Sequence, residues 1–196
     1  MTDRATATAT ATALLALWND VEPALDAAYN EWHAHEHVPE RLTVPGMLWA
    51  HRFGHSAAQA PMPRYLTLYG LRDAAVLDGA PYQRLLAEPT PMSARMRPAL
   101  RNISRWVCRL HRPGRLDAAP HVSVRTWLDD AAQPDDPADG DETTLVAEHL
   151  PQAAALPWLQ AAQERLMAGR WLVCRPLPEG AMPDPSSCGY RRLPIG

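Results

Sequence analysis

Residues 29–41 read YNEWHAHEHVPER, and this stretch carries the strongest signal in the sequence. It holds three histidines, three carboxylates and two aromatic residues at what the pattern predicts to be the end of a helix. Side chains that titrate near neutral pH are rarely concentrated in this way by packing alone. The stretch therefore marks a candidate functional site, on the helix around which the rest of the fold is predicted.

This helix is predicted to run from about Glu22 to His37. Pro23 suits a first helical turn, and Pro39 cannot continue a helix, so the pattern ends there. Apolar and aromatic side chains recur at helical spacing and would form one buried face. The residues on that face are Leu25, Ala28, Tyr29, Trp32 and Glu36.

Four strands are predicted around this helix, from short apolar runs and from alternation of apolar and polar residues. Residues 73–101 carry helical segments that prolines interrupt. The resulting order of strand, helix, strand, strand, helix, strand is that of the split βαβ unit of ferredoxin-like folds. The predicted strands are residues 12–18, 47–53, 65–71 and 103–111.

Residues 1–112 are thus predicted to form one ferredoxin-like unit, and residues 113–120 a linker. Residues 121–196 are predicted to form a second, degenerate unit that packs its sheet against the first. A helix is expected at 157–168, and the acidic segment 129–141 is expected to be an exposed loop. The strands expected in this half are residues 121–128, 143–148, 171–175 and 187–193.

Composition narrows the possible chemistry. All 19 basic residues are arginine, which excludes Schiff-base chemistry and a P-loop lysine. A net charge of −3 gives no indication of nucleic-acid binding, and no segment approaches the roughly 20 apolar residues of a membrane helix. The three cysteines (Cys108, Cys174 and Cys188) have no metal or disulfide spacing and indicate reduced thiols, hence a cytoplasmic protein. The Ala, Arg and Pro bias is typical of a bacterial, GC-rich genome.

The motif YNEWH…EHVPERL…VPG within residues 29–46 resembles the dimeric α/β-barrel superfamily, most closely its EthD-like and muconolactone-isomerase-like members. The likeness covers roughly residues 12–111. It implies an α+β fold of antiparallel sheets flanked by helices in a dimeric-α/β-barrel-type arrangement. In such a protein the second half could replace the partner subunit, and a homodimer is also possible. Members of the superfamily include cofactor-free isomerases, cyclases and monooxygenases, haem enzymes, and proteins of unknown role.

The resemblance implies that His37 lies at the helix end, beside a pocket between sheet and helices. An imidazole with an ordinary pKa near 6.5 can both accept and donate a proton. His37 is thus the expected acid/base, and Glu36 or Arg41 would set its orientation or charge. A pocket for a hydrophobic small molecule would be shaped by Tyr29, Trp32, His33, His51 and Tyr69.

Two other interpretations stay open. His33 and His37, four residues apart, could hold a metal or haem instead of serving a cofactor-free enzyme. Alternatively, the histidines could simply cap the helix of a non-catalytic ligand-binding or assembly protein. Elsewhere, Arg95, Arg97, Arg101 and Arg105 are expected to form a solvated helical face.

Overall fold

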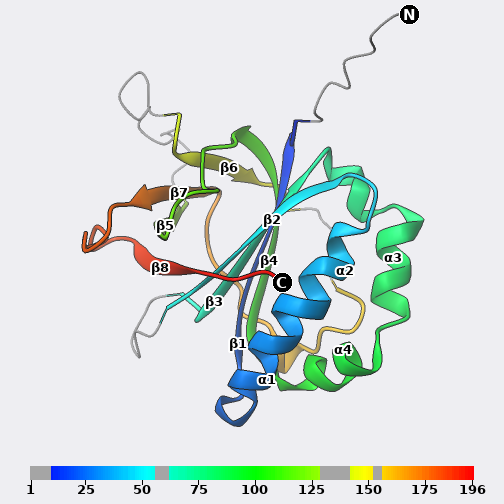
Figure 1. Ribbon diagram of the computed structural model, residues 1–196. Coiled ribbons are helices and arrows are strands. Elements are labelled where there is room, and N and C mark those ends of the chain that lie inside the picture. The colour runs from blue at the N-terminus through cyan, green and yellow to red at the C-terminus, as the bar shows by residue number, and fades with distance from the viewer. Residues whose placement is uncertain (1–9, 56–61, 129–141, 152–155) are drawn as a thin grey trace, which may run out of the picture.

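The computed structural model describes residues 10–55, 62–128, 142–151 and 156–196. Within these residues the chain forms a closed barrel of eight antiparallel strands, with helices packed on one side of its outer surface (Figure 1). The order around the barrel is β1-β3-β2-β8-β5-β7-β6-β4, and β4 pairs with β1. The strands are β1 (Ala13–Val21), β2 (Met47–Gly54), β3 (Tyr65–Leu71), β4 (Leu100–Arg112), β5 (His121–Trp127), β6 (Leu145–His149), β7 (Trp171–Leu177) and β8 (Cys188–Leu193).

Alternation along the strands divides the apolar side chains between two cores. In β1, Leu14 and Ala16 belong to the core inside the barrel, while Leu15 belongs to the core between the barrel wall and the helices. Every strand predicted from the sequence is confirmed to within a few residues. The largest side chains inside the barrel are Trp18, Trp106, Tyr190, Phe53, Leu66 and Leu68.

The predicted fold class was wrong. The sequence suggested two ferredoxin-like units with helix-flanked sheets, a dimeric-α/β-barrel-type arrangement, whereas the structure is a single closed β-barrel. The two halves join along two seams, where β2 pairs with β8 and β4 pairs with β6. Because each strand thereby has a neighbour on both sides, the barrel has no free sheet edge.

The helices cover the outer face of the first-half strands (Figure 1). The first group is η1 (Pro23–Leu25), α1 (Asp26–Trp32), the π-helical turn η2 (His33–His37) and α2 (Val38–Leu42). The second group is η3 (Ala74–Leu77), α3 (Ala80–Ala87), α4 (Pro91–Met96) and η4 (Arg97–Ala99), and it matches the proline-broken helices predicted for residues 73–101. One further short turn, η5 (Ala161–Gln163), lies in the second half.

Two helix predictions were wrong. Pro39 does not end the first helical region, which continues as α2 to Leu42. The predicted helix at 157–168 is instead an irregular segment containing η5, and it lies beside the start of β4. There Glu164 forms a parallel bridge with Ile103, so pairing with the barrel replaces helical hydrogen bonds.

Some expectations fall on residues outside the described ranges, namely the acidic loop at 129–141 and part of the loop between β2 and β3. Among the described residues, no helix has the length and apolar character needed to cross a membrane.

Candidate functional site

The residues HAHEH, at positions 33–37, form a π-helical turn between α1 and α2. Its hydrogen bond runs from the backbone N–H of Val38 to the carbonyl of His33, five residues back rather than four. The rings of His33 and His37 lie on the same side of this turn, with centroids 4.9 Å apart. Single π-helical turns are rare and occur frequently at functional sites.

Pro39 shapes the same turn through the N–H group that it lacks. In the π pattern, residue 39 would donate to the carbonyl of Ala34, but proline has no donor. The Ala34 carbonyl instead accepts the backbone N–H of Gly196 at 3.0 Å. A residue distant in sequence therefore satisfies the backbone of the histidine turn.

The two histidines border a cavity of about 60 Å³ between the helices and the outer wall of the barrel. This volume is several times the roughly 10–15 Å³ that a single water molecule needs. The lining is largely apolar and aromatic, with a few polar groups that converge on it, as expected for a ligand site. It comprises Leu17, Trp18, Asn19, Tyr29, Trp32, His33, His37, Arg41, Tyr82, Leu86, Ser93, Arg97, Leu100, Ile103, Leu156 and Trp158.

Burial keeps both histidines neutral. Desolvation lowers the pKa of His33 and of His37 well below 6.5, and the charges of Arg41 and Arg52 lower both further. The His37 ring packs against Trp32 with centroids 4.6 Å apart. Within the described residues, Nδ1 of each histidine is buried and has no hydrogen-bond partner. At neutral pH these rings are therefore available as proton acceptors.

Two guanidinium groups give the cavity a positive potential. Arg41 is 5% exposed, and its Nη1 donates to the Glu40 carboxylate at 3.1 Å. Arg97 donates from Nη2 to the carbonyl of Leu85 at 3.3 Å and lies 5.0 Å from the centre of the Trp158 ring. An anionic group inside the cavity would therefore be stabilised by nearby positive charge.

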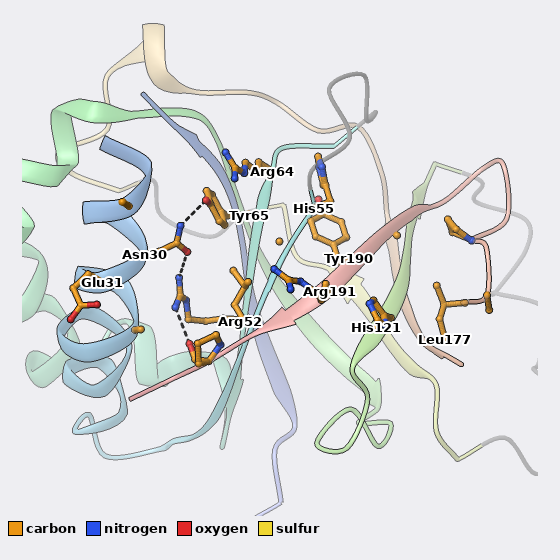
Figure 2. A pocket seen from close by; sticks show the side chains of 18 of the residues that line it. Asn30, Glu31, Arg52, His55, Arg64, Tyr65, His121, Leu177, Tyr190 and Arg191 are labelled. Carbon is orange, nitrogen blue, oxygen red and sulfur yellow. Dashed lines mark hydrogen bonds between the residues drawn. The ribbon is translucent and has the colours of Figure 1, made fainter. Parts of the chain in front are cut away.

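A second, larger hollow of about 830 Å³ lies on the outside of the barrel, between α1 and residues 180–183 (Figure 2). It is open to solvent. Asn30, Arg52 and Tyr65 line it at the end near α1 (Figure 2).

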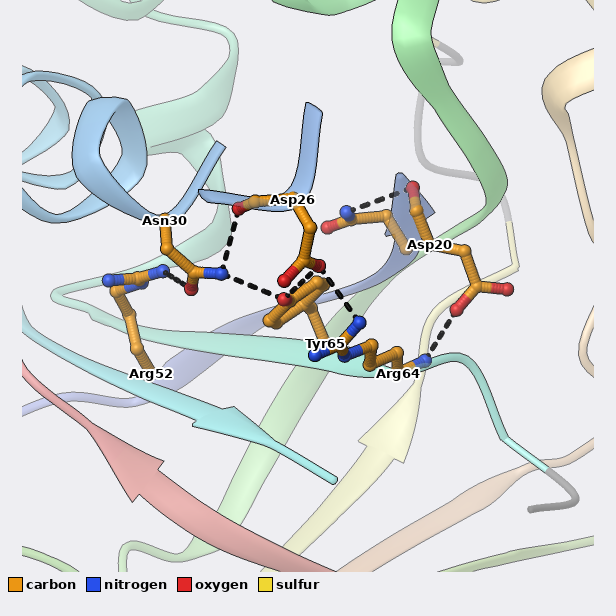
Figure 3. Close-up of polar contacts among 7 residues, drawn as sticks. Asp20, Asp26, Asn30, Arg52, Arg64 and Tyr65 are labelled. Carbon is orange, nitrogen blue, oxygen red and sulfur yellow. Dashed lines mark hydrogen bonds and ion pairs between the residues drawn. The ribbon is translucent and has the colours of Figure 1, made fainter. Parts of the chain in front are cut away.

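A polar network at that end fixes α1 onto β2 and β3 (Figure 3). Arg52 donates to Asn30 Oδ1 at 3.1 Å, and Asn30 Nδ2 donates to the Tyr65 hydroxyl at 2.8 Å. The hydroxyl of Tyr65 in turn donates to Asp26 at 2.6 Å, and Arg64 forms an ion pair with the same carboxylate at 2.9 Å. The helix that carries the histidines is thus held in one position relative to the barrel.

The structure brings five of the expected site residues together around the cavity: Tyr29, Trp32, His33, His37 and Arg41. Three others lie elsewhere. Glu36 accepts a hydrogen bond from Thr90 rather than from His37. Tyr69 is buried beneath the helices and is not part of the lining.

His51 is the third residue outside the cavity. It is on β2, where its Nδ1 lies 3.1 Å from Nη1 of Arg192 and its Nε2 lies 3.5 Å from Oδ1 of Asp117. Burial and the charge of Arg192 lower its pKa to about 4, and Asp117 opposes this shift.

Sequence reasoning missed Arg97, Ser93 and Trp158 as lining residues. Arg97 was expected on a solvated helical face with Arg95, Arg101 and Arg105. In the structure Arg101 and Arg105 lie on β4, and Arg95 is exposed whereas Arg97 is half-buried. No local pattern distinguishes the two arginines, because the difference arises from the position of α4 against the barrel. Trp158 reaches the cavity from the segment that was expected to be helical.

Within the part of the chain that the structure describes, no group of three or more His, Cys, Asp or Glu side chains is placed to hold a metal ion. The chain was also compared with protein-family models, with curated proteins and with solved structures. No family model, curated protein or solved structure matches it.

Proposed function

We propose that this protein is a small enzyme that works without a cofactor and uses His37 as a general acid/base on a hydrophobic small metabolite. The observation that carries this proposal is a neutral His37 ring at the wall of a largely apolar cavity that two arginines also line. A neutral imidazole accepts a proton, and the positive charges favour the anion that proton removal leaves behind.

The chemistry follows from the charges. His37 takes a proton from a carbon or hydroxyl of the substrate, and the electron pair left behind gives an enolate-like or phenolate-like anion. Arg41 and Arg97 stabilise that anion. The anion also offsets the arginine charges that lower the pKa of His37, so the imidazolium becomes easier to form as the proton moves. Returning the proton to a different atom completes an isomerisation.

Supporting roles follow from position. Tyr29 and Trp32 form the aromatic wall of the cavity, and the His33 ring contacts both of them as well as His37. Glu36 holds the histidine turn to α4 through Thr90. The largely apolar lining strengthens electrostatic interactions inside the cavity.

The test is proton exchange from carbon. The protein is incubated in D₂O with a panel of small lactones, enolisable ketones and phenols, and deuterium incorporation is followed by NMR. We expect exchange that is lost in His37→Gln and retained in His35→Gln, because His35 is exposed on the same turn. Exchange that survives His37→Gln would contradict the mechanism. Binding of a panel compound without deuterium exchange, in the unchanged protein as well as in both variants, would instead favour a non-catalytic ligand-binding protein.

A further inference from the structure

The hollow of about 830 Å³ on the outside of the barrel, called the groove below, has a floor formed by paired residues of neighbouring strands. His121 lies opposite Arg191 across β5 and β8, Arg191 lies opposite Gly54 across β8 and β2, and Gly54 lies opposite Tyr65 across β2 and β3. Directly opposed residues point to the same face of a sheet. These four residues therefore form one row across four strands, and all four line the groove (Figure 2).

Positive charge dominates this floor. Arg191 is exposed, and the described residues provide it with no ion-pair partner. Arg52 is 2% exposed, and the acceptors of its guanidinium are neutral oxygens, the Pro194 carbonyl at 2.9 Å and Asn30 Oδ1 at 3.1 Å. A buried cation without a counter-ion is unfavourable, so an anion bound nearby would stabilise it.

The carboxylates around the groove do not provide that counter-ion. Glu31 is the one acidic residue of the lining; its side chain is 78% exposed and lies 3.8 Å from His35. Asp26 is already paired with Arg64. The uncompensated charge at Arg52 and Arg191 therefore remains available to a ligand.

The opposite wall is apolar. Leu177, Met182 and Pro183 line it, and Met182 is 86% exposed. Between this wall and α1, the side chains of Leu193 and Tyr65 lie against Gly54 and form part of the floor. A Cβ at residue 54 would lie 3.1 Å from Leu193 Cδ1 and 3.4 Å from the Tyr65 ring.

We propose that this groove is a second binding site, separate from the His37 cavity, for an organic anion with an apolar body. The anionic group binds at Arg191 and Arg52, and the apolar body lies against the wall formed by Leu177 and Met182. The volume of about 830 Å³ accommodates a molecule with two rings, and it is much larger than the cavity of about 60 Å³ beside His37.

Naphthalene-2-sulfonate is a suitable probe, because it combines one negative charge with a two-ring apolar body. Titration by calorimetry should show saturable binding that weakens as salt is raised, since the interaction is partly electrostatic. The uncharged 2-naphthol, with the same rings, should bind about tenfold more weakly, the loss expected for charge-assisted hydrogen bonds. Naphthalene-2-carboxylate and 2-naphthyl phosphate then identify which anionic group the site prefers.

Three variants locate the binding. Arg191→Gln should weaken sulfonate binding about tenfold, while Arg175→Gln, at an exposed arginine of β7 outside the groove, should leave it unchanged. His37→Gln should have no effect, which separates this proposal from the proposed enzymatic function.

Several results would overturn the proposal. They are the absence of saturable binding, equal affinity for 2-naphthol, or unchanged affinity in Arg191→Gln. Loss of binding in His37→Gln with retention in Arg191→Gln would place the probe at the other cavity. Arg191 is exposed, so its replacement leaves the core intact and a lost affinity is not a folding defect.

Discussion

The hydroxyl of Thr90 donates a hydrogen bond to the carboxylate of Glu36, and so joins the histidine turn to α4. The same oxygen accepts the backbone N–H of Ser93 at 3.0 Å and caps that helix. One side chain therefore supports both the start of α4, which leads to Arg97, and the turn that carries His37.

Replacing Thr90 with alanine should remove both hydrogen bonds. The expected loss in the free energy of unfolding is about 1 to 2 kcal/mol, as for other helix N-caps. Thr90→Ser keeps the hydroxyl and should retain most of the stability. Urea unfolding of the three proteins measures this, and equal losses in the alanine and serine variants would show that the hydroxyl is not responsible.

Stability should fall as the solution is acidified below pH 6.5. The pKa values of His33 and His37 are lowered in the folded protein, and that of His51 is lowered to about 4. Below their unfolded pKa of about 6.5, the unfolded chain takes up protons that the folded protein does not bind, so stability is complete above that pH and is lost below it.

Each of these histidines contributes a slope of up to about 1.4 kcal/mol per pH unit. Urea unfolding at pH 7.5, 6.5 and 5.5 measures the total slope. His37→Gln should reduce the slope. A slope that His37→Gln does not alter would mean that His37 is protonated as readily in the folded protein as in the unfolded chain.

Gly70 is required by the Trp49 ring, which lies across it. A Cβ at residue 70 would be 2.0 Å from Trp49 Cε2, and the two residues pair directly between β2 and β3. Gly70→Ala should therefore cost about 1 to 3 kcal/mol of stability through overpacking.

The double variant Gly70→Ala/Trp49→Val tests the cause. If the clash is with Trp49, the alanine should cost much less in the background that lacks the indole. If the stability losses of the two single variants simply add in the double variant, the cost of Gly70→Ala arises from a neighbour other than Trp49. Denaturant unfolding of all four proteins gives the coupling free energy.

Pro39→Ala should release Gly196 from the histidine turn. The new N–H at residue 39 can bond within the helix and compete for the Ala34 carbonyl that Gly196 now uses. Hydrogen exchange of the Gly196 amide should accelerate about tenfold, which corresponds to one hydrogen bond of about 1.4 kcal/mol.

The amide of Arg192 serves as an internal reference for that experiment, because it bonds to the Pro120 carbonyl at 2.8 Å and not to the turn. Its exchange should not change. Acceleration at both amides would indicate general loosening of the C-terminal segment, and no change at Gly196 would show that the alanine N–H does not enter the turn.

The strands could be predicted because their signal is local. Alternation in 47–53 and the apolar run in 12–18 each reflect which faces are buried, and both became strands of the barrel. The closure of that barrel was not predictable in the same way. The pairing of Arg52 with Leu193 joins residues far apart in the chain, and no local pattern records it. The fold class was therefore wrong although its strands were right.

The helix predicted at 157–168 shows how tertiary contacts override propensity. Gln163 Nε2 donates to the carbonyls of Arg97 at 2.8 Å and Leu100 at 2.9 Å, and the Arg165 amide donates to Ile103 at 2.8 Å. These bonds satisfy backbone oxygens near the start of β4 and hold the segment out of a helix. At the candidate site, the histidine cluster could be predicted because its residues are close together in the sequence. Arg97 and Trp158 come to the cavity only through tertiary packing, which no local pattern indicates.

The bond between Gly196 and Ala34 also bears on the order in which the protein folds. The histidine turn follows α1, early in the sequence. The carbonyl of Ala34 in this turn gains its hydrogen bond only after β8 has paired with β2 and brought residues 194–196 to the turn. Contacts between such distant residues form late, since the loop between them must close first. A folding intermediate made of the first four strands would therefore have its helices in place while the histidine turn remained incomplete, so that the candidate site would be completed in the last step of folding.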